Sequence, residues 1–466
     1  MARLLLNVIY IVVFIVALYK AVGFEGEEQY FKYGMGGWEG LEDEIAMVTT
    51  NKSERTPVNV HSFGAVGDGN SDDTQAFIAA WNKACSLRNA VFLVPDGFRY
   101  LVRAVNFQGP CMRHLVIQIG GTIVAPDEPE NWDAKYPRIW LLFSQLNMAS
   151  IQGGGIIDGS GSKWWASSCK RNKTNPCRGA PTALTIEKSS MFRVNDLTVQ
   201  NSQQIQLTIH GSSKVRISNV QVHAPETSPN TDGIHITHST DVIVQDCQIG
   251  TGDDCISIVS GSSNIRMKNI NCGPGHGISI GSLGHNNQTE TVSGVVLDKA
   301  TITGTSNGLR IKTWQGGSGY ARGFLFENVI MVNVSNPIII DQFYCDSPTT
   351  CRNQTSAVEV SEIIYRNITG TSNTLKAMKF ACSNVVPCRN IVLNNIHLEM
   401  ISNGTKKAET YCNSAVGFAY GHVQPVADCL NAVNCTCHDT QVGASNPKLH
   451  FGPHRQPQDV IVHTEL

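Results

Sequence analysis

The centre of the chain repeats one pattern of apolar and polar positions. Residues 212–222 read Ser-Ser-Lys-Val-Arg-Ile-Ser-Asn-Val-Gln-Val, and similar segments begin 27 and then a further 23 residues on, at 239–249 and 262–272. A second apolar run recurs in step with them, at 233–236, 255–258, 277–280 and 308–311. Alternation with a period of two predicts strands. Short strands repeated at this interval predict an all-β fold, a parallel β-helix in which each coil stacks on the one before.

One helix is predicted near the start of the repeats, after two candidate N-cap residues, Asp72 and Asp73. Its apolar face would consist of Ala76, Phe77, Ala80, Trp81 and Ala84. A helix at this place would cover the open edge of the first coil, which is otherwise free to pair with another chain. We therefore expect an N-terminal capping helix.

The pattern changes at both ends of the chain. Residues 4–18 form an apolar run that is shorter than the about 20 residues of a membrane span, and Ala21-Val22-Gly23 offers a cleavage site. We predict a signal peptide over 1–23, with a signal anchor as the alternative. Four segments follow from the pattern: 1–23 as signal peptide, 24–56 as an N-terminal arm or propeptide, 57–437 as the β-helix, and 438–466 as a C-terminal tail.

The cysteines fit a secreted protein. Fifteen are present, and Cys169/Cys177, Cys345/Cys351 and Cys382/Cys388 are close enough in sequence to close small disulfide loops. Metal binding is the alternative, but the spacings lack paired CxxC half-sites. An odd count leaves one thiol over, and Cys247, within a strand-like run, is the candidate. Eight N-glycosylation sequons also point to secretion: Asn51, Asn172, Asn287, Asn333, Asn353, Asn367, Asn403 and Asn434.

The charges narrow the possible ligands. Formal net charge is −2, so the chain lacks the overall basic field that gathers nucleic acid, and an anionic ligand would need a local cluster of cations. We expect no nucleic acid partner, no metal, no cofactor and no membrane contact once the signal peptide is removed. A monomer is the expected state.

Charged residues occupy the same position in successive repeats. Asp232, Asp254 and His276 are spaced by 22 residues, so stacked coils would place these three in one stripe, with Asp253 alongside. Alternation does not decide which way Asp232 and Asp254 point, because each lies at a coil corner. Single aspartates at coil corners are usually turn residues. Adjacent carboxylates, however, raise at least one pKa, as a general acid requires.

Two cations follow on a nearby strand. Arg310 and Lys312 are two residues apart, so both side chains leave the same face, and a column of His235, Ser257 and Ser279 should lie next to them. A guanidinium fork and an ammonium group suit a sugar carboxylate. A solvated basic corner is the alternative.

The same residues carry a family resemblance. The segments 228–235, 250–255, 272–282 and 308–312 resemble the four signature segments of polygalacturonases, and 63–74 and 157–165 resemble the plant branch of that family. The resemblance implies a right-handed parallel β-helix that hydrolyses α-1,4-galacturonosyl linkages of pectin with inversion. It implies that Asp253 donates the proton, that Asp232 and Asp254 activate water, and that His276 supports them. Substrate-binding roles would fall to Arg310, Lys312, Tyr344 and His235.

Three alternatives stay open on sequence grounds: a lyase, a rhamnogalacturonan hydrolase, and a non-catalytic wall protein that only binds pectin. We further predict a disulfide between Cys255, which follows the aspartate pair, and Cys272, which opens the Gly-Pro-Gly-His turn. Two buried thiols are the alternative there. The expected location is extracellular, in the cell wall.

Overall fold

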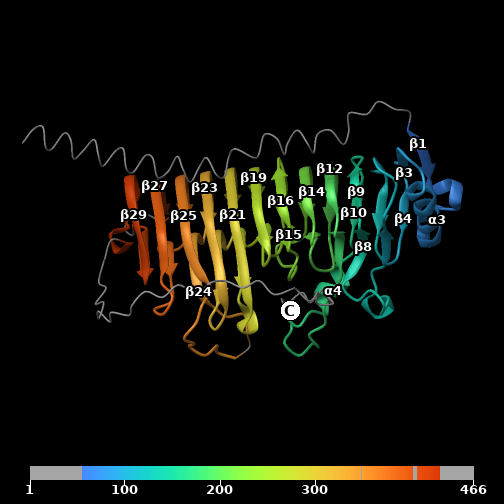
Figure 1. The fold of residues 1–466 in the computed structure, drawn as a ribbon. Helices are drawn as coiled ribbons and strands as arrows, with labels where there is room; N and C mark the ends of the chain where they lie inside the picture. Colours follow the sequence, from blue (N-terminus) through green and yellow to red (C-terminus); the bar gives the residue numbers. More distant parts are fainter. Residues whose placement is uncertain (1–54, 348, 402–406, 431–466) are drawn as a thin grey trace, which may run out of the picture.

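The computed structural model describes residues 55–347, 349–401 and 407–430. Their strands lie side by side in one long row of coils (Figure 1). They form two parallel sheets, one of 18 strands and one of 11. The predicted parallel β-helix is confirmed. The signal peptide, nearly all of the N-terminal arm and the C-terminal tail fall outside the described residues, and their boundaries stay predictions.

The longer sheet contains the first repeated segment. Val215 lies opposite Val242, and Val242 lies opposite Ile265, so the three copies stack in register as the repeat predicts. The strands concerned are β12 (Ser190–Gln200), β14 (Ser213–His223), β16 (Thr240–Gln245), β17 (Gln248–Gly250), β19 (Ser262–Cys272), β21 (Thr289–Thr303) and β23 (Ser318–Val334).

The shorter sheet contains the second run. Ile234 pairs with Ile256, which pairs with Ile278. Its central strands are β13 (Leu207–His210), β15 (Ile234–Thr237), β18 (Ile256–Ile258), β20 (Ile278–Leu283), β22 (Asn307–Trp314) and β24 (Asn336–Tyr344).

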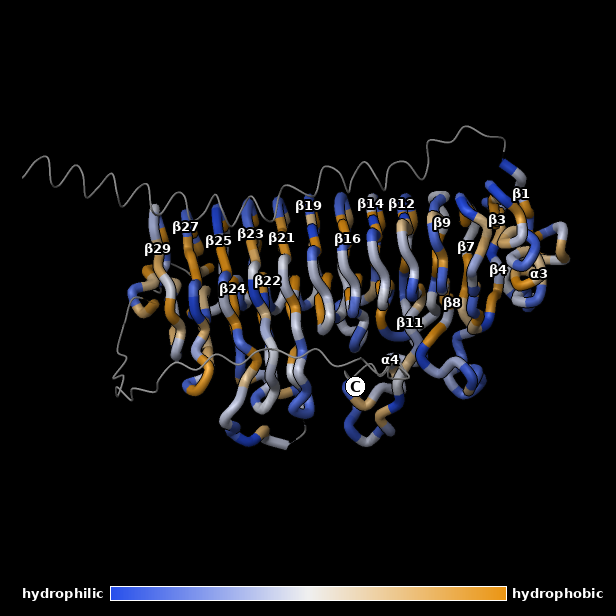
Figure 2. The backbone as a smooth tube through the Cα atoms, viewed as in Figure 1, coloured by the Kyte–Doolittle hydropathy of each residue, from blue (hydrophilic) through white to orange (hydrophobic). Residues whose placement is uncertain are grey.

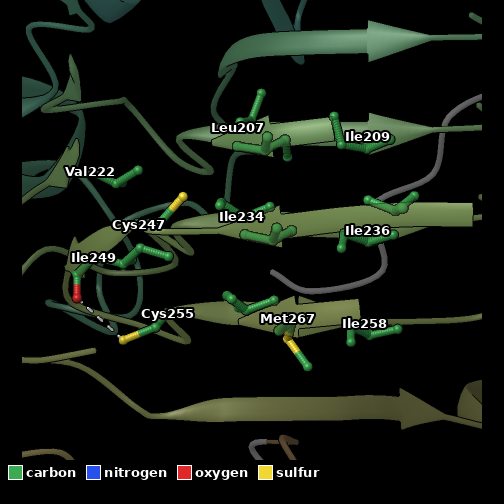
Figure 3. Packing of buried hydrophobic residues seen from close by; sticks show 14 of the residues in the cluster. Leu207, Ile209, Val222, Ile234, Ile236, Cys247, Ile249, Cys255, Ile258 and Met267 are labelled. Carbon is green, nitrogen blue, oxygen red and sulfur yellow. Dashed lines mark hydrogen bonds between the residues drawn. The ribbon is translucent and has the colours of Figure 1, made fainter. Parts of the chain in front are cut away.

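The core lies between the two sheets and repeats from coil to coil. Figure 3 shows Ile209, Ile236 and Ile258 at the same level of neighbouring strands, and all three are fully buried. Hydrophilic residues gather instead at strand ends and in the loops (Figure 2). Because every coil buries the same positions, each strand's outward residues are held at a fixed height and direction.

The capping helix is α3 (Thr74–Cys85), and its predicted apolar face is buried. Trp81 packs against Phe107 and Phe143, with ring centroids 5.1 and 5.7 Å apart. The cap itself differs from the expectation in one respect. Asp72 accepts hydrogen bonds from the Thr74 backbone and hydroxyl, whereas the Asp73 carboxylate turns back to the preceding loop. In the described part of the chain, no helix is long and apolar enough to cross a membrane.

Among the described residues, six disulfides join twelve cysteines. The three short loops expected from sequence are closed, and Cys255 is paired with Cys272. Two further bridges, Cys85–Cys111 and Cys412–Cys429, were not predicted from the sequence. Cys247 is a buried free thiol, and burial raises its pKa to about 12.

Five of the eight sequon asparagines are described, and all five are exposed: Asn172, Asn287, Asn333, Asn353 and Asn367. Asn51, Asn403 and Asn434 fall outside the described residues. Glycosylation therefore stays a prediction at every sequon.

Candidate active site

A polar column runs along the outer face of the shorter sheet. His235 pairs with Ser257, Ser257 with Ser279, and Ser279 with Arg310, on four successive strands. The flanking isoleucines and Leu309 are buried and point inward, so strict alternation turns these four side chains outward. The predicted column is confirmed.

Asp254 lies beneath this column and is fully buried. Its Oδ1 accepts hydrogen bonds from Arg310 Nη2 at 2.7 Å and from the Ser279 hydroxyl at 2.8 Å. Lys312 Nζ reaches its Oδ2 at 3.2 Å. The side chains of Lys312 and Arg310 are only 3% and 13% exposed. The two predicted substrate-binding cations thus neutralise a carboxylate of the chain itself, and Arg310 is the more accessible of the two.

Asp232 occupies the same position one coil earlier and is also buried, at 2% exposure. The Ser257 hydroxyl donates to its Oδ2 at 2.7 Å, and His235 Nδ1 lies 2.8 Å from the same hydroxyl oxygen. Ser257 therefore links the predicted base to His235. Both serines of the column serve as bridges between a carboxylate and a basic side chain.

Asp253 and His276 form the solvent-accessible part of the site. His276 Nδ1 lies 2.9 Å from Asp253 Oδ1, and the side chains are 42% and 15% exposed. The predicted stripe is confirmed for the backbone, and the structure decides the side-chain directions that the sequence left open. The backbones of Asp232, Asp254 and His276 are in phase, but the two aspartates turn into the buried network while the histidine pairs with Asp253.

The pKa of Asp253, the predicted proton donor, is lowered rather than raised. Burial does oppose its ionisation, but the hydrogen bond and charge of His276, together with the charges of Lys312 and Arg310, outweigh burial and lower the Asp253 pKa to about 2. The same hydrogen bond to Asp253 raises the pKa of His276 above its usual value. Opposite charges placed nearby decide both shifts.

Comparison with known proteins identifies the family of the chain. The model of the glycosyl hydrolases family 28 matches residues 85–418. A probable polygalacturonase of Arabidopsis thaliana is 49% identical over 378 residues, which cover 81% of this chain and 85% of that protein. A polygalacturonase of Persea americana is 48% identical, with 78% of each chain covered. The chain belongs to glycosyl hydrolases family 28.

Solved structures support the fold of this family 28 chain. An endo-xylogalacturonan hydrolase from Aspergillus tubingensis superposes with a TM-score of 0.66 at 21% identity, covering 79% of this chain and 99% of that one. A polygalacturonase from Erwinia carotovora gives 0.62 at 20% identity, covering 80% and 99%. At these identities the likeness concerns the β-helix alone.

An aromatic cluster extends the site of the family 28 chain beyond the predicted residues. Tyr344 meets Trp314 edge to face at 5.3 Å, Trp314 packs on His285 at 4.5 Å, and Lys312 Nζ lies 5.2 Å from the Tyr344 ring. Sequence reasoning included Tyr344 but missed Trp314 and His285. Trp314 had a signal, because it continues the every-second-residue series of Arg310 and Lys312 on β22.

Three groups of the site have donor atoms close enough for a metal ion. Ligand atoms of Asp253, Asp254 and His276 all lie within 4.8 Å of one another. The oxygens of Asp254, however, already face Arg310 and Lys312, and His276 already faces Asp253. A cation would have to displace these positive partners, so the donor set suits an internal salt-bridge network better than a metal.

Proposed function

We propose that the chain hydrolyses α-1,4-galacturonosyl linkages of homogalacturonan, the unesterified stretches of pectin. The family, and relatives named as polygalacturonases at 48–49% identity, support this activity. The observation that carries it in this chain is the Asp253–His276 pair, an accessible acid and histidine set beside a buried carboxylate with two cations. A groove for an anionic sugar needs this combination of a proton carrier and positive charge.

Asp253 is the proposed proton donor. In the free protein the pair holds its proton on His276, since the pKa of Asp253 is lowered and that of His276 is raised. Negative charge that develops on the leaving glycosidic oxygen would draw the proton away from the pair. The proton then passes from His276 to Asp253 and on to the leaving glycosidic oxygen. His276 is thus the proton reservoir of the pair.

Arg310 and Lys312 are the proposed partners of the substrate carboxylate. Arg310 is the accessible member, so an incoming galacturonate would compete with Asp254 for its guanidinium. Loss of that partner frees Asp254 Oδ1 to accept a proton from the attacking water, a role we assign jointly to Asp254 and Asp232. His235 would support Asp232 through Ser257, and Tyr344 would present its ring to the sugar beside Lys312.

Inversion is the proposed stereochemistry. A retaining enzyme needs a carboxylate that attacks the sugar directly. Asp254 is fully buried, with both oxygens hydrogen-bonded, which is unsuited to direct attack. Oxygens of Asp253 and Asp254 lie within 4.8 Å, shorter than the about 6.5–9.5 Å carboxyl separation usual for inversion. The carboxyl separation therefore does not support inversion, whereas the burial of Asp254 supports it.

We also propose that the protein is secreted into the plant cell wall and acts there as a monomer. Six disulfides support an oxidising compartment. Expression with its native N-terminus, followed by N-terminal sequencing of the secreted protein and light scattering, tests both statements.

The decisive test of the activity is incubation with polygalacturonate. We expect new reducing ends and saturated products, and NMR of the first product should show the anomer opposite to that of the substrate. Ultraviolet-absorbing unsaturated ends would instead identify a lyase. Binding without any new reducing ends would identify a pectin-binding wall protein. Turnover only of rhamnogalacturonan would identify that hydrolase.

A further inference from the structure

Two loops stand at opposite ends of the strands of the shorter sheet. Residues 167–181 connect α4 (Ser162–Ala166) to β11 (Thr182–Glu187), so this loop precedes its strand, whereas residues 345–358 follow β24. The strands of this sheet are parallel. The first loop therefore leaves the sheet at the end where the candidate catalytic aspartates lie, and the second leaves it at the other end.

The two loops meet although their coils are far apart. Lys170 Nζ lies 2.6 Å from Asp346 Oδ2. Strands β13, β15, β18, β20 and β22 lie between β11 and β24, so six steps of about 4.8 Å separate the two coils, about 29 Å in all. Both loops project on the same side of the row of coils, beyond α4 and β24 (Figure 1). Because the core fills the space between the sheets, the connection passes over the outer face, across the strands that carry the candidate active site.

Each loop is anchored on its own coil. At the base of the first loop, Trp165 Nε1 donates to the backbone carbonyl of Ser202 at 3.0 Å. At the base of the second, Gln315 and Ala357 form an antiparallel bridge. A short disulfide closes each loop, and in both loops the charged residue of the ion pair directly follows a bridged cysteine. Two stiff walls are thus joined at their tips by an ion pair.

The join is weak and its chemistry suits a polyanion. The side chains of Lys170 and Asp346 are 32% and 40% exposed, and an ion pair this exposed shifts an equilibrium by about fivefold at most. The join can therefore open and close. The first loop carries three further exposed cations, Arg171, Lys173 and Arg178, and no acidic residue. A carboxylate chain beneath it would meet positive charge and compete with Asp346 for Lys170.

We infer that the two loops, joined by Lys170 and Asp346, form a clasp that retains the galacturonan chain over the active site. The inference rests on the proposed function and adds how the substrate is held. A chain enters from the side while the clasp is open, and the closed clasp keeps it from leaving sideways. Several bonds of one chain are then cut before the protein releases it.

Charge reversal tests the clasp. Lys170→Asp and Asp346→Lys each break the ion pair, but they change the charge of the loops in opposite directions. The protein is bound to labelled polygalacturonate, an excess of unlabelled polygalacturonate is added, and the labelled products formed afterwards are counted per bound protein. We expect both variants to make fewer cuts per encounter than the wild type, by up to about fivefold. The double variant, which re-forms the pair with the charges exchanged, should recover the wild-type number.

The matched control is Lys163→Asp. Lys163 lies on α4 and pairs with Asp127 and Glu128, which belong to the same end of the shorter sheet, so its exposed ion pairs do not cross the site. Its number of cuts per encounter should equal that of the wild type. Opposite effects of the two single reversals would indicate a general attraction of the polyanion and overturn the clasp. Unchanged numbers in both, no recovery in the double variant, or an equal loss in the control would also overturn it. If the wild type makes no reducing ends from polygalacturonate, the proposed function itself fails.

Discussion

The same coils present polar side chains on two outer faces, and the two faces behave differently. On the longer sheet, Asn219 donates to Asp196 at 2.6 Å and Asn269 to Asp246 at 2.7 Å, in an exposed ladder. On the shorter sheet, Asp254 is fully buried among Arg310, Lys312 and Ser279. Stacking by one coil creates both arrangements, so stacking does not by itself distinguish a structural aspartate from a catalytic one.

Burial and backbone conformation make the distinction. The ladder residues adopt left-handed φ values, 52° at Asn219 and 53° at Asn269, which Asn and Asp tolerate better than other residues with a side chain. Their amides and carboxylates remain in water, where one hydrogen bond contributes little. The buried carboxylates lose their hydration and need positive partners. Removing a partner should therefore have a small effect in the ladder and a large one in the site.

The largest effect is expected for Asp253→Asn. An amide cannot deliver a proton, and positioned acid catalysis is worth about 10²-fold or more, so hydrolysis should fall by at least that factor without loss of the fold. Reducing-end assays and thermal melts measure the two quantities. The matched control is Asp246→Asn in the ladder, which should retain full activity. A rate above about a tenth of the wild type for Asp253→Asn would remove Asp253 from its proposed role.

Asp254→Ala should have the largest effect on stability. It leaves Lys312 buried without its carboxylate, and breaking a buried pair costs about 3–5 kcal/mol of unfolding free energy. Denaturant unfolding measures the loss. The ladder variant Asp241→Ala, which removes one exposed partner of Asn264 at a φ of 57°, should cost only about 1 kcal/mol. Equal losses of unfolding free energy in the two variants would show that the two faces do not differ in how strongly they depend on their aspartates.

Removal of the Cys255–Cys272 bridge should come next. The bridge closes a loop of 17 residues, for which the chain-entropy model gives about 3 kcal/mol. The double variant Cys255→Ser, Cys272→Ser should also lose activity at temperatures below its melting transition, because Cys255 adjoins Asp254. Cys345→Ser, Cys351→Ser, which opens an exposed loop, is the control. Full activity of the first double variant up to its melting temperature would show that the bridge does not position the aspartates.

The pH dependence should follow the Asp253–His276 pair. The folded pKa of Asp253 is lowered from 3.8 to about 2, so its stabilisation is complete above 3.8 and is lost as the pH falls towards 2. The folded pKa of His276 is raised above 6.5, so its stabilisation is complete below 6.5 and is lost as the pH rises through that raised value. The alkaline limb of kcat/KM should therefore have an apparent pKa above 6.5. His276→Gln should abolish this limb, and an unchanged limb in that variant would assign it to another group.

The smallest effect is expected within the ladder. Asn269→Ala removes one exposed hydrogen bond and places alanine at a φ of 53°, a left-handed conformation that alanine tolerates less well than asparagine. The variant should lose about 1 kcal/mol of unfolding free energy. Asn269→Gly, which restores the backbone freedom, should recover part of that loss. Chemical denaturation of the two variants resolves the backbone contribution from the hydrogen bond. Activity should be unchanged in both.

The sequence by itself determined the coil and its phase. Apolar alternation placed Ile234, Ile256 and Ile278 in register, and the same phase predicted the column from His235 to Arg310. The buried face of α3 could also be predicted, because apolar residues with a helical period have few other interpretations. These features depend on local periodicity, which can be recognised directly in the amino-acid sequence.

Only the tertiary structure decided how the charged side chains pair. Asp232 and Asp254 stand at coil corners, where alternation ends, so their burial depended on neighbours from other coils. Pairing of His276 with Asp253 then reversed the expected direction of the carboxyl pKa shift. The bridge between Cys85 and Cys111 and the position of His285 against Trp314 likewise arise between coils. Electrostatic and packing interactions depend on distance in space, which a periodic pattern fixes for the backbone but not for the ends of side chains.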